Sequence, residues 1–376
     1  MIFEYVPMNS VCRPKQWKTI SSSNLKASGY PVYGANGKIG FNDSYTHENP
    51  TLMITCRGAT CGTVNISEPK SYINGNAMAL DSLDEARVHI KFLYYFFKQR
   101  GFRDVITGSA QPQITRQGLQ KVKLPLPPLP IQKQIAAVLE KADNLRQQSQ
   151  QMEQELNSLA QSVFFDMFGD SLKNEKKWVS KTVLDVSRKV TDGTHQTPEW
   201  SDSGIPFLFI SNIRDGEVNF DTKKFITLEC FKELTKTTPI EPDDILYTTV
   251  GSYGHVALVK SSFPEFCFQR HIAHIKPDPE KILPEFLYYQ LQSQGCKHQA
   301  DNLVRGIAQK TLNLKDLKSI RIIIPPIELQ KEYVLKVSVL SRFKHLNKVE
   351  GLDLKLFFNS LMQRAFKGEL DLKDVA

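Results

Sequence analysis

The chain has 376 residues, of which 41% are hydrophobic and 23% charged, so it is long enough to form two or three domains with buried cores. No run approaches the roughly 18 apolar residues that a membrane-spanning helix needs, and the first residues do not have the pattern of a signal peptide. Six scattered cysteines are typical of a reduced cytosol rather than of a disulfide scaffold, which predicts a cytoplasmic protein.

The net charge of +8 suggests a polyanionic partner, but the charge is unevenly distributed. Residues 1–124 hold 15 basic and 8 acidic residues, residues 125–180 hold 6 and 7, residues 181–324 hold 18 and 18, and residues 325–376 hold 9 and 7. Bulk charge therefore favours nucleic-acid binding only for the first of these segments. A second binding surface would depend on where individual charges lie.

The first segment, residues 1–124, has the pattern of a mixed α/β domain. Asn36 and Gly37 stand between β-prone flanks, which is the signature of a tight hairpin. Residues 51–58 and 61–66 are predicted to be short strands around a glycine loop. Residues 88–101 predict an amphipathic helix that Gly101 ends.

A long helix is predicted over residues 131–168. Four prolines precede it and mark its start: Pro125, Pro127, Pro128 and Pro130. Apolar residues then recur every three or four positions in a narrow stripe: Ile135, Val138, Leu139, Ala142, Leu145, Met152, Leu156, Leu159 and Val163. A stripe of this kind needs a partner helix.

The second half of the chain follows the same plan. Residues 205–213, 244–251 and 255–260 are strand-like, and residues 284–295 predict a helix with a proline at its start and Gly295 at its end. A second long helix is predicted over residues 327–366, with the following apolar stripe: Val334, Val337, Leu340, Leu346, Val349, Leu352, Leu356 and Leu361. Gly351 is expected to interrupt and kink it.

The two halves are a tandem repeat. The tetrapeptide FLYY occurs at Phe92–Tyr95 and again at Phe286–Tyr289. Further matches follow in the same order at offsets of 194 to 202 residues: Gly101 and Gly295, GSAQPQI and GIAQKTL, the proline pairs 127–128 and 325–326, Gln132 and Gln330, Asn157–Leu159 and Asn359–Leu361. A period this long excludes a solenoid and indicates duplication of a whole domain with its trailing helix.

The predicted fold class is therefore α+β. Two homologous mixed α/β domains, residues 1–124 and 171–324, are joined by two helical regions, residues 125–170 and 325–376. The two long helices are expected to pair, antiparallel and in the manner of a coiled coil, and to relate the halves by a pseudo-twofold. Such a scaffold suits a protein that recognises two patches on a linear polymer such as DNA.

No catalytic motif is found in the sequence. The GANGKIG segment lacks the first glycine of a phosphate loop, and the proline pairs lack the preceding residue of an amino-methyltransferase motif. His271 and His274 are interpreted as packed or DNA-facing histidines, and Cys56 and Cys61 lack zinc-ligand spacing. The FLYY aromatics are interpreted as core residues. We expect no metal, no cofactor and no catalytic residue on this chain.

Candidate DNA contacts are donor-rich loop residues, because Arg pairs with guanine, and Asn or Gln with adenine, in the major groove. In the first domain they are Asn36, Lys38, Arg57, Thr60, Ser109, Gln111, Gln113, Thr115 and Arg116. In the second domain they are Thr194, His195, Gln196, Asn212, Arg214, Ser252, Tyr253, Arg305, Gln309, Lys310 and Thr311. Each of them could equally be a solvated loop residue.

Three segments carry a resemblance to a known family: PLPPLPIQKQIAAVLEKAD (125–143), GYPVYGANGKIGF (29–41) and TDGTHQTP (191–198). With the order of the parts, they resemble the specificity subunit of type I restriction–modification systems over essentially the whole chain. The first domain lacks the DGTH-type opening of the second, so the resemblance does not imply that the two domains recognise related sequences.

The resemblance implies that each domain is a target recognition domain for one half of a split double-stranded DNA site. It implies that the helices fix the spacing and dock two methyltransferase subunits. Adenine methylation with S-adenosylmethionine, and translocation and cleavage with ATP and Mg²⁺, would belong to methyltransferase and restriction subunits. This chain would be non-catalytic.

Two other interpretations remain open at this point. The chain could be the recognition part of a two-subunit type II restriction–modification enzyme, although it carries no catalytic motifs of its own. It could also be an adaptor for protein or RNA, but RNA-binding domains usually present aromatic residues on a sheet, whereas the aromatics here have helical spacing. The recognised bases, the spacer length and the presence of a restriction subunit cannot be predicted from the sequence.

Overall fold

The computed structural model describes residues 3–35, 37–108, 111–306 and 309–372. The chain forms two compact units, Met1–Met152 with Asn347–Ala376, and Glu153–Leu346. We call residues 3–124 of the first unit the first head, and residues 171–324 of the second unit the second head. The boundary between the units falls within the long helices, because each helix contributes one part to each unit. No helix in the described part of the chain is long and apolar enough to cross a membrane.

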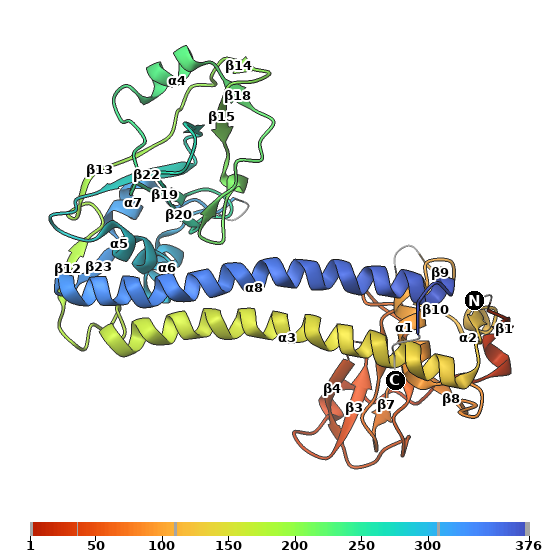
Figure 1. Ribbon diagram of the computed structural model, residues 1–376. Coiled ribbons are helices and arrows are strands. Elements are labelled where there is room, and N and C mark those ends of the chain that lie inside the picture. Colours follow the sequence, from red (N-terminus) through yellow and green to blue (C-terminus); the bar gives the residue numbers. More distant parts are fainter. Residues whose placement is uncertain (1–2, 36, 109–110, 307–308, 373–376) are drawn as a thin grey trace. The chain divides into compact units, whose positions relative to one another are not determined.

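The two predicted long helices are confirmed as α3, Leu129–Phe168, and α8, Ile327–Lys367 (Figure 1). In the first unit the Asn347 amide donates to the Ser149 carbonyl at 2.9 Å, and the Phe358 ring lies 5.7 Å from the Arg146 guanidinium. Residue numbers therefore rise along α8 as they fall along α3, so the helices pair antiparallel. In the second unit the Phe164 and Tyr333 rings pack 5.6 Å apart.

The prediction that Gly351 interrupts the second long helix is wrong, because α8 continues through it. A Cβ atom at this position would lie 2.8 Å from the Ser149 hydroxyl of α3. The missing side chain therefore allows close approach of the two helices rather than a break.

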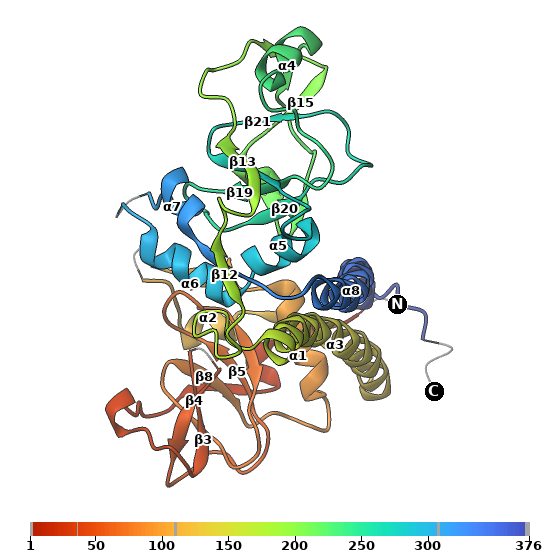
Figure 2. The same cartoon turned by 90° about the vertical axis from the view of Figure 1, so that its left-hand side faces the viewer.

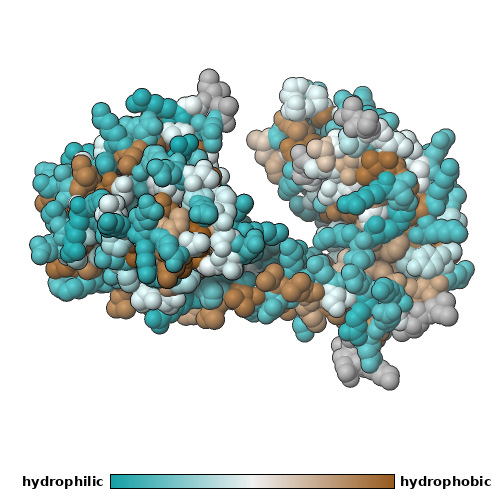
Figure 3. Space-filling view, turned by 90° about the horizontal axis from the view of Figure 1, so that it is seen from above, coloured by the Kyte–Doolittle hydropathy of each residue, from teal (hydrophilic) through white to brown (hydrophobic). Residues whose placement is uncertain are grey.

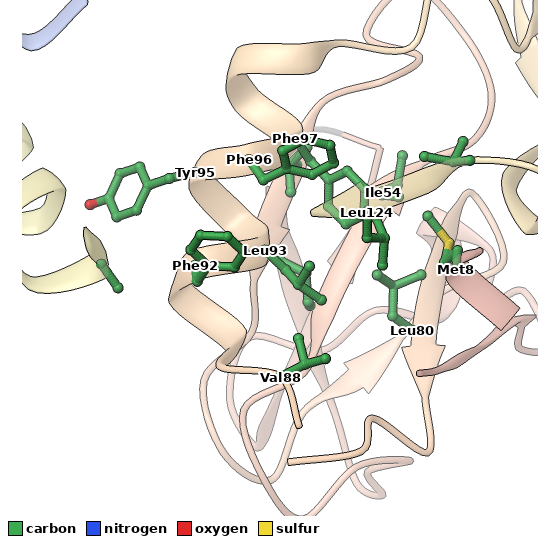
Figure 4. Close-up of a cluster of buried hydrophobic side chains, with 14 of the residues drawn as sticks. Met8, Ile54, Leu80, Val88, Phe92, Leu93, Tyr95, Phe96, Phe97 and Leu124 are labelled. Atoms are coloured by element: carbon green, nitrogen blue, oxygen red, sulfur yellow. The ribbon is translucent and has the colours of Figure 1, made fainter. Parts of the chain in front are cut away.

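The first head is built around a four-stranded sheet of order β2-β8-β5-β6, with β2 Arg13–Gln16, β8 Ala77–Asp81, β5 Leu52–Thr55 and β6 Val64–Ile66. Helix α1, Ile90–Arg100, packs its aromatic face on this sheet, and Phe92, Leu93 and Phe97 lie in one core (Figure 4). The core interpretation of the FLYY motif is thus confirmed. Gly101 ends α1 with φ +65°, and its N–H donates to the Phe97 carbonyl.

Smaller elements complete the first head. Strands β3, Tyr30–Gly34, and β4, Gly37–Asn42, form the predicted hairpin, with Gly34 opposite Gly37. The remaining elements are β1 Tyr5–Pro7, η1 Met8–Ser10, η2 Ser22–Asn24, β7 Tyr72–Ile73, β9 Ile106–Thr107, β10 Gln113–Ile114, α2 Arg116–Gln120 and β11 Lys123–Pro125. Strand β7 runs parallel to β3, and β1 pairs with β11, which leads into α3.

The second head repeats this plan with a sheet of order β13-β22-β19-β20, formed by β13 Ser187–Asp192, β22 Ile272–Pro277, β19 Ile245–Thr248 and β20 Val256–Leu258. The other elements are β12 Val179–Thr182, β14 Trp200–Ser201, β15 Ile205–Leu208, η3 Ile210–Asn212, β16 Ile213–Arg214, β17 Glu217–Val218, β18 Phe225–Ile226, α4 Leu228–Thr235, β21 Cys267–Phe268, α5 Pro284–Leu291, α6 Gln294–Leu303, α7 Leu314–Ser319 and β23 Arg321–Ile324. Helix α4 and strands β15 and β21 lie on the side of the sheet away from α5 and α6 (Figure 2).

The strand pairings confirm the duplication. The parallel pair β15–β21 matches β3–β7, and the antiparallel pair β12–β23 matches β1–β11. The heads differ in the connection after the matched strand. A tight hairpin follows β3, whereas residues 209–224 separate β15 from β18 and include β16 and β17.

The prediction that Gly295 ends the second FLYY helix is wrong. Helix α5 ends at Leu291, and the Ser293 hydroxyl accepts a hydrogen bond from the Cys296 N–H to start α6. Gly295 lies inside α6, where a Cβ atom would be 2.1 Å from the Ser171 hydroxyl. Here the local serine cap determines the boundary, and the glycine provides room for a neighbouring segment.

The repeated proline–glutamine segment joins each head to its long helix. The buried Gln132 side chain accepts from the His89 N–H at 2.9 Å, just before α1, and donates to the Arg87 and Pro127 carbonyls, each at 2.8 Å. Gln330 accepts from the Leu283 N–H at 3.0 Å, just before α5, and donates to the Pro325 carbonyl at 2.8 Å. Each glutamine thus satisfies backbone groups that would otherwise be buried without partners.

Candidate nucleic-acid interface

Two loops of the first head are bonded together at one end of its main sheet. The glycine loop, residues 56–62, follows β5, and residues 111–114 of the second loop precede α2. The Gly58 N–H donates to the Pro112 carbonyl at 3.2 Å, and the Ile114 N–H donates to the Cys56 carbonyl at 3.0 Å. These bonds bring together two loops that the sequence analysis selected separately.

The second head repeats the same bonds at the matching positions. The Gly251 N–H donates to the Lys310 carbonyl, and the Leu312 N–H to the Thr249 carbonyl, each at 2.8 Å. A third segment joins in both heads, since the Cys56 N–H donates to the Asn76 carbonyl and the Thr249 N–H to the His271 carbonyl. We call each set of bonded loops a platform: residues 56–62, 74–76 and 111–114 in the first head, and 249–255, 269–271, 305–306 and 309–312 in the second.

The first platform presents exposed side chains of the predicted type. Arg57, Gln111 and Gln113 are exposed, and Arg57 forms a backbone bridge with Gln113. Arg116 is exposed at the start of α2, where the Thr115 hydroxyl accepts from the Gly118 N–H as a helix cap. These side chains can reach a ligand at the sheet end without rearrangement of the backbone.

The other candidates of the first head have internal contacts or lie outside the described residues. The Thr60 hydroxyl donates to the Ala35 carbonyl at 3.0 Å, and the Lys38 ammonium forms an ion pair with Glu68 at 3.2 Å. Asn36 and Ser109 fall outside the described ranges.

On the second platform Ser252, Arg305, Gln309 and Lys310 are exposed, and Thr311 forms a backbone bridge with Arg305. The Arg305 guanidinium lies 3.9 Å from the Asp316 carboxylate. The half-buried Tyr253 donates its hydroxyl to the Asp301 carboxylate at 2.6 Å, which raises the pKa of the tyrosine.

The remaining candidates of the second head divide into a loop beside the platform and a separate group. Thr194, His195 and Gln196 follow β13, and the Thr194 backbone is bonded to the platform turn. Asn212 lies in the connection after β15 and is buried. Its amide donates to the carbonyls of Asn219 and Asp221, and its Oδ1 accepts from the Phe209 N–H. The Asn212 side chain is thus used for internal hydrogen bonds, which does not support the predicted DNA contact. Arg214, two residues further on, is half-buried.

Two further residues lie on the second platform: Arg270, which was not among the predicted DNA contacts, and His271, which was interpreted only as a packed or DNA-facing histidine. Arg270 is exposed in the turn between β21 and β22, and its Nε donates to Nε2 of the neighbouring His271 at 3.4 Å. Burial, Arg270 and His195 all lower the pKa of His271. One sequence signal could have indicated these residues: QRH, residues 269–271, stands directly before β22, the strand that matches β8 of the first head.

His274 does not face the same way as His271. It is buried in β22, and its Nε2 lies 2.6 Å from the Asp244 carboxylate, which also accepts from Lys276 at 2.8 Å. The interpretation of His274 as a packed histidine is thus confirmed. Within the described ranges, no three His, Cys, Asp or Glu side chains are grouped so that they could hold a metal ion.

Comparison with known families decides the classification. The family model described as "Type I restriction modification DNA specificity domain" matches residues 3–158 and 175–353. The chain belongs to this family. The two matches correspond to the two repeats, each with its head and part of a long helix.

Curated members of the family are similar over most of the chain. The EcoBI specificity subunit of a type I restriction enzyme from Escherichia coli is 26% identical, over 85% of this chain and 73% of that protein. The MjaVIII specificity subunit from Methanocaldococcus jannaschii is 21% identical, over 90% of this chain and 83% of that protein.

Solved structures share the fold. The S subunit of a type I restriction–modification system from M. genitalium superposes with a TM-score of 0.68 at 17% identity, over 97% of this chain and 96% of that one. A chain from a study of complex assembly in the type I system gives a TM-score of 0.51 at 15% identity, over 98% of both chains. These likenesses confirm the predicted architecture of two α+β heads and two long helices.

Proposed function

We propose that this chain is the DNA-recognition subunit of a type I restriction–modification complex, in which each head recognises one half of a split site. The observation that carries the proposal is the repeated platform. Both heads use the same backbone bonds to present two loops at the same end of the sheet, but the exposed side chains differ. Gln111 is matched by another glutamine, Gln309, but Pro112 corresponds to Lys310 and Gln113 to Thr311. A shared scaffold with different donors is what two different half-sites require.

The long helices are proposed to set the spacing between the half-sites and to bind methyltransferase subunits. Large apolar side chains remain exposed on them, and Figure 3 shows hydrophobic side chains along the surface of the helices. On α8 they are Ile327, Leu335, Val339, Phe343, Leu346, Val349, Leu352, Leu356 and Phe357. Apolar surface of this extent favours a protein partner.

The chemistry is proposed to lie on partner subunits, with S-adenosylmethionine on the methyltransferase and ATP and Mg²⁺ on a restriction subunit. The basis is the family membership together with the lack of catalytic motifs in the sequence. The purified chain alone is then expected to bind DNA but to show no methylation, nuclease or ATPase turnover. Turnover that a point substitution in this chain abolishes would contradict this assignment.

The test is to map methylated adenines in genomic DNA from cells with and without this gene. The expected result is a split motif, two short half-sites around an unread spacer, that disappears when the gene is deleted. Plasmid sites whose spacer is changed by one base pair should stay unmethylated, because the change rotates one half-site by about 35° and shifts it by about 3.4 Å. A methylation pattern that does not depend on the gene would refute the proposal.

A further inference from the structure

The DGTH segment of the second head has a structural role that explains its residues. Gly193 follows β13, and a Cβ atom there would lie 2.2 Å from the Phe268 carbonyl oxygen and 2.5 Å from the Gln269 carbonyl oxygen. Only glycine fits this approach without a shift of the backbone. The Thr194 N–H then donates to the Phe268 carbonyl, and the Arg270 N–H donates to the Thr194 carbonyl. The segment therefore fixes the backbone of the turn that carries Arg270.

Side-chain bonds stabilise the DGTH segment itself, and Thr249 holds the turn from the platform side. The Asp192 carboxylate lies 2.9 Å from Nε2 of the exposed His195, and the Thr194 hydroxyl donates to the Gln196 carbonyl. On the platform side, the Thr249 N–H and hydroxyl both donate to the His271 carbonyl, at 2.9 and 3.0 Å. Arg270 is thus an exposed residue on a backbone that is bonded on each side.

The Arg270 side chain is oriented by a hydrogen bond but has no acidic partner among the described residues. Its Nε donates to His271 Nε2, and it forms no ion pair with any residue in the described part of the chain. The contact occupies Nε and leaves the two terminal nitrogens available. Two adjacent N–H donors held in one plane match the O6 and N7 acceptors of guanine in the major groove. A phosphate contact would not require this orientation.

We propose that Arg270 is a specificity-determining residue of the second head, oriented by His271 and the DGTH segment to recognise a guanine edge in the second half-site. This inference rests on the proposed function. It adds a base-recognising side chain outside the two loops selected from the sequence, and it assigns His271 a positioning role.

The test uses the full chain in its cellular complex and maps adenine methylation for the variants Arg270→Ala and Arg270→Lys. We expect both variants to lose discrimination at one position of the second half-site by roughly ten- to a hundredfold, with the first half-site unchanged. Lysine should not restore the full discrimination, because it keeps the charge but lacks the planar pair of guanidinium donors. The retained first half-site reports that the variant is folded and assembled.

Arg188→Ala is the matched control. Like Arg270, Arg188 is exposed. It lies on β13 at the end away from the DGTH segment and has a contact of 3.8 Å to Asp278. It should leave the motif unchanged. An unchanged motif in Arg270→Ala, or full restoration by Arg270→Lys, would overturn the inference. Absence of any gene-dependent motif for the unmodified chain would instead refute the proposed function, so the two failures are distinguishable.

His271→Gln tests the positioning role. The glutamine oxygen can still accept from Arg270, whereas His271→Leu cannot. We expect the leucine variant to lose discrimination at the same single position as Arg270→Ala, and the glutamine variant to retain most of it. Equal behaviour of the two variants would show that His271 does not act through Arg270.

Discussion

The two heads share their scaffold but differ beside the platform, where the segment after β2 or β13 passes close to the turn before β8 or β22. In the first head the crossing glycine is Gly75, in the turn before β8, and a Cβ atom there would lie 2.6 Å from the Trp17 carbonyl oxygen. In the second head it is Gly193, on the opposite segment. The pairing of β2 with β8 and of β13 with β22 makes Trp17 the counterpart of Gly193, and Gly75 the counterpart of Arg270. The duplicated fold keeps the close crossing, but each head presents side chains from a different segment.

This difference shows how one scaffold can present different side chains at matching positions. The backbone bonds of the platform are the same in both heads, so the presented side chains can change without loss of the fold. Where the first head has a glycine, the second has an exposed arginine, and where the second has a glycine, the first has Trp17 with the Lys15 ammonium 3.6 Å from its ring. The predictions that follow use matched positions of the two heads.

The largest effect is expected from charges placed in the cores where α3 and α8 join the heads. Leu139 is fully buried in the first unit, and its repeat counterpart Val337 is buried in the second. An aspartate at either position should cost about 4 kcal/mol or more, because it combines a lost apolar contact with an unpaired buried charge. Leu156→Asp is the milder comparison, since Leu156 is only half-buried. Thermal or denaturant unfolding would measure all three, and a soluble Leu139→Asp protein with unchanged stability would contradict the core assignment.

The buried glutamines Gln132 and Gln330 should contribute differently to the stability of the two units. Gln132→Met removes three hydrogen bonds and leaves buried backbone groups unpaired, whereas Gln330→Met removes two. We expect losses of about 3 and 2 kcal/mol in the free energy of unfolding, respectively. Urea unfolding of both variants checks the order. A larger loss for Gln330→Met would mean that the hydrogen bonds do not determine the difference.

Substitution of Gly75 or Gly193 should weaken recognition of only the half-site that its own head recognises. Gly193→Ala should weaken recognition of the second half-site, and Gly75→Ala that of the first, because the added methyl group collides with fixed backbone oxygens. Gly118→Ala is the control, since its Cβ atom would make only an ordinary contact 3.4 Å from the Thr115 hydroxyl. Methylation motifs of the three variants test this, and loss of the same half-site by both crossing variants would refute the correspondence.

The smallest effect concerns pH and the first unit. Burial, Lys133 and Lys91 lower the pKa of His89, against a smaller opposing effect of Glu140. The unfolded chain therefore takes up the proton at higher pH than the folded chain, so stability decreases as the pH falls through the unfolded pKa of about 6.5. His89→Gln should make the unfolding midpoint less dependent on pH between about 7 and 5. An unchanged dependence would exclude His89 as the source.

The sequence predicts most of the scaffold because the scaffold is repeated. The FLYY helices, the hairpin at Gly37 and both long helices follow from local patterns that occur twice or are strongly periodic. The predictions for Gly295 and Gly351 were wrong. A glycine that ends or interrupts a helix cannot be told apart in sequence from one that makes room for a neighbouring segment. Asn212 was selected for its type, but it lies in a connection without counterpart in the first head. Arg270 was missed because its role depends on a crossing with the DGTH segment, a contact between residues some 75 positions apart.

The central claim is that each head recognises its own half-site through its own platform. The most direct measurement is the adenine methylation motif produced by two double variants, Gln111→Ala with Gln113→Ala and Arg305→Ala with Lys310→Ala. The account predicts that the first pair alters only one half of the motif and the second pair only the other half, at about 1–3 kcal/mol per lost base contact. Changes in both halves of the motif caused by substitutions in a single head would contradict it.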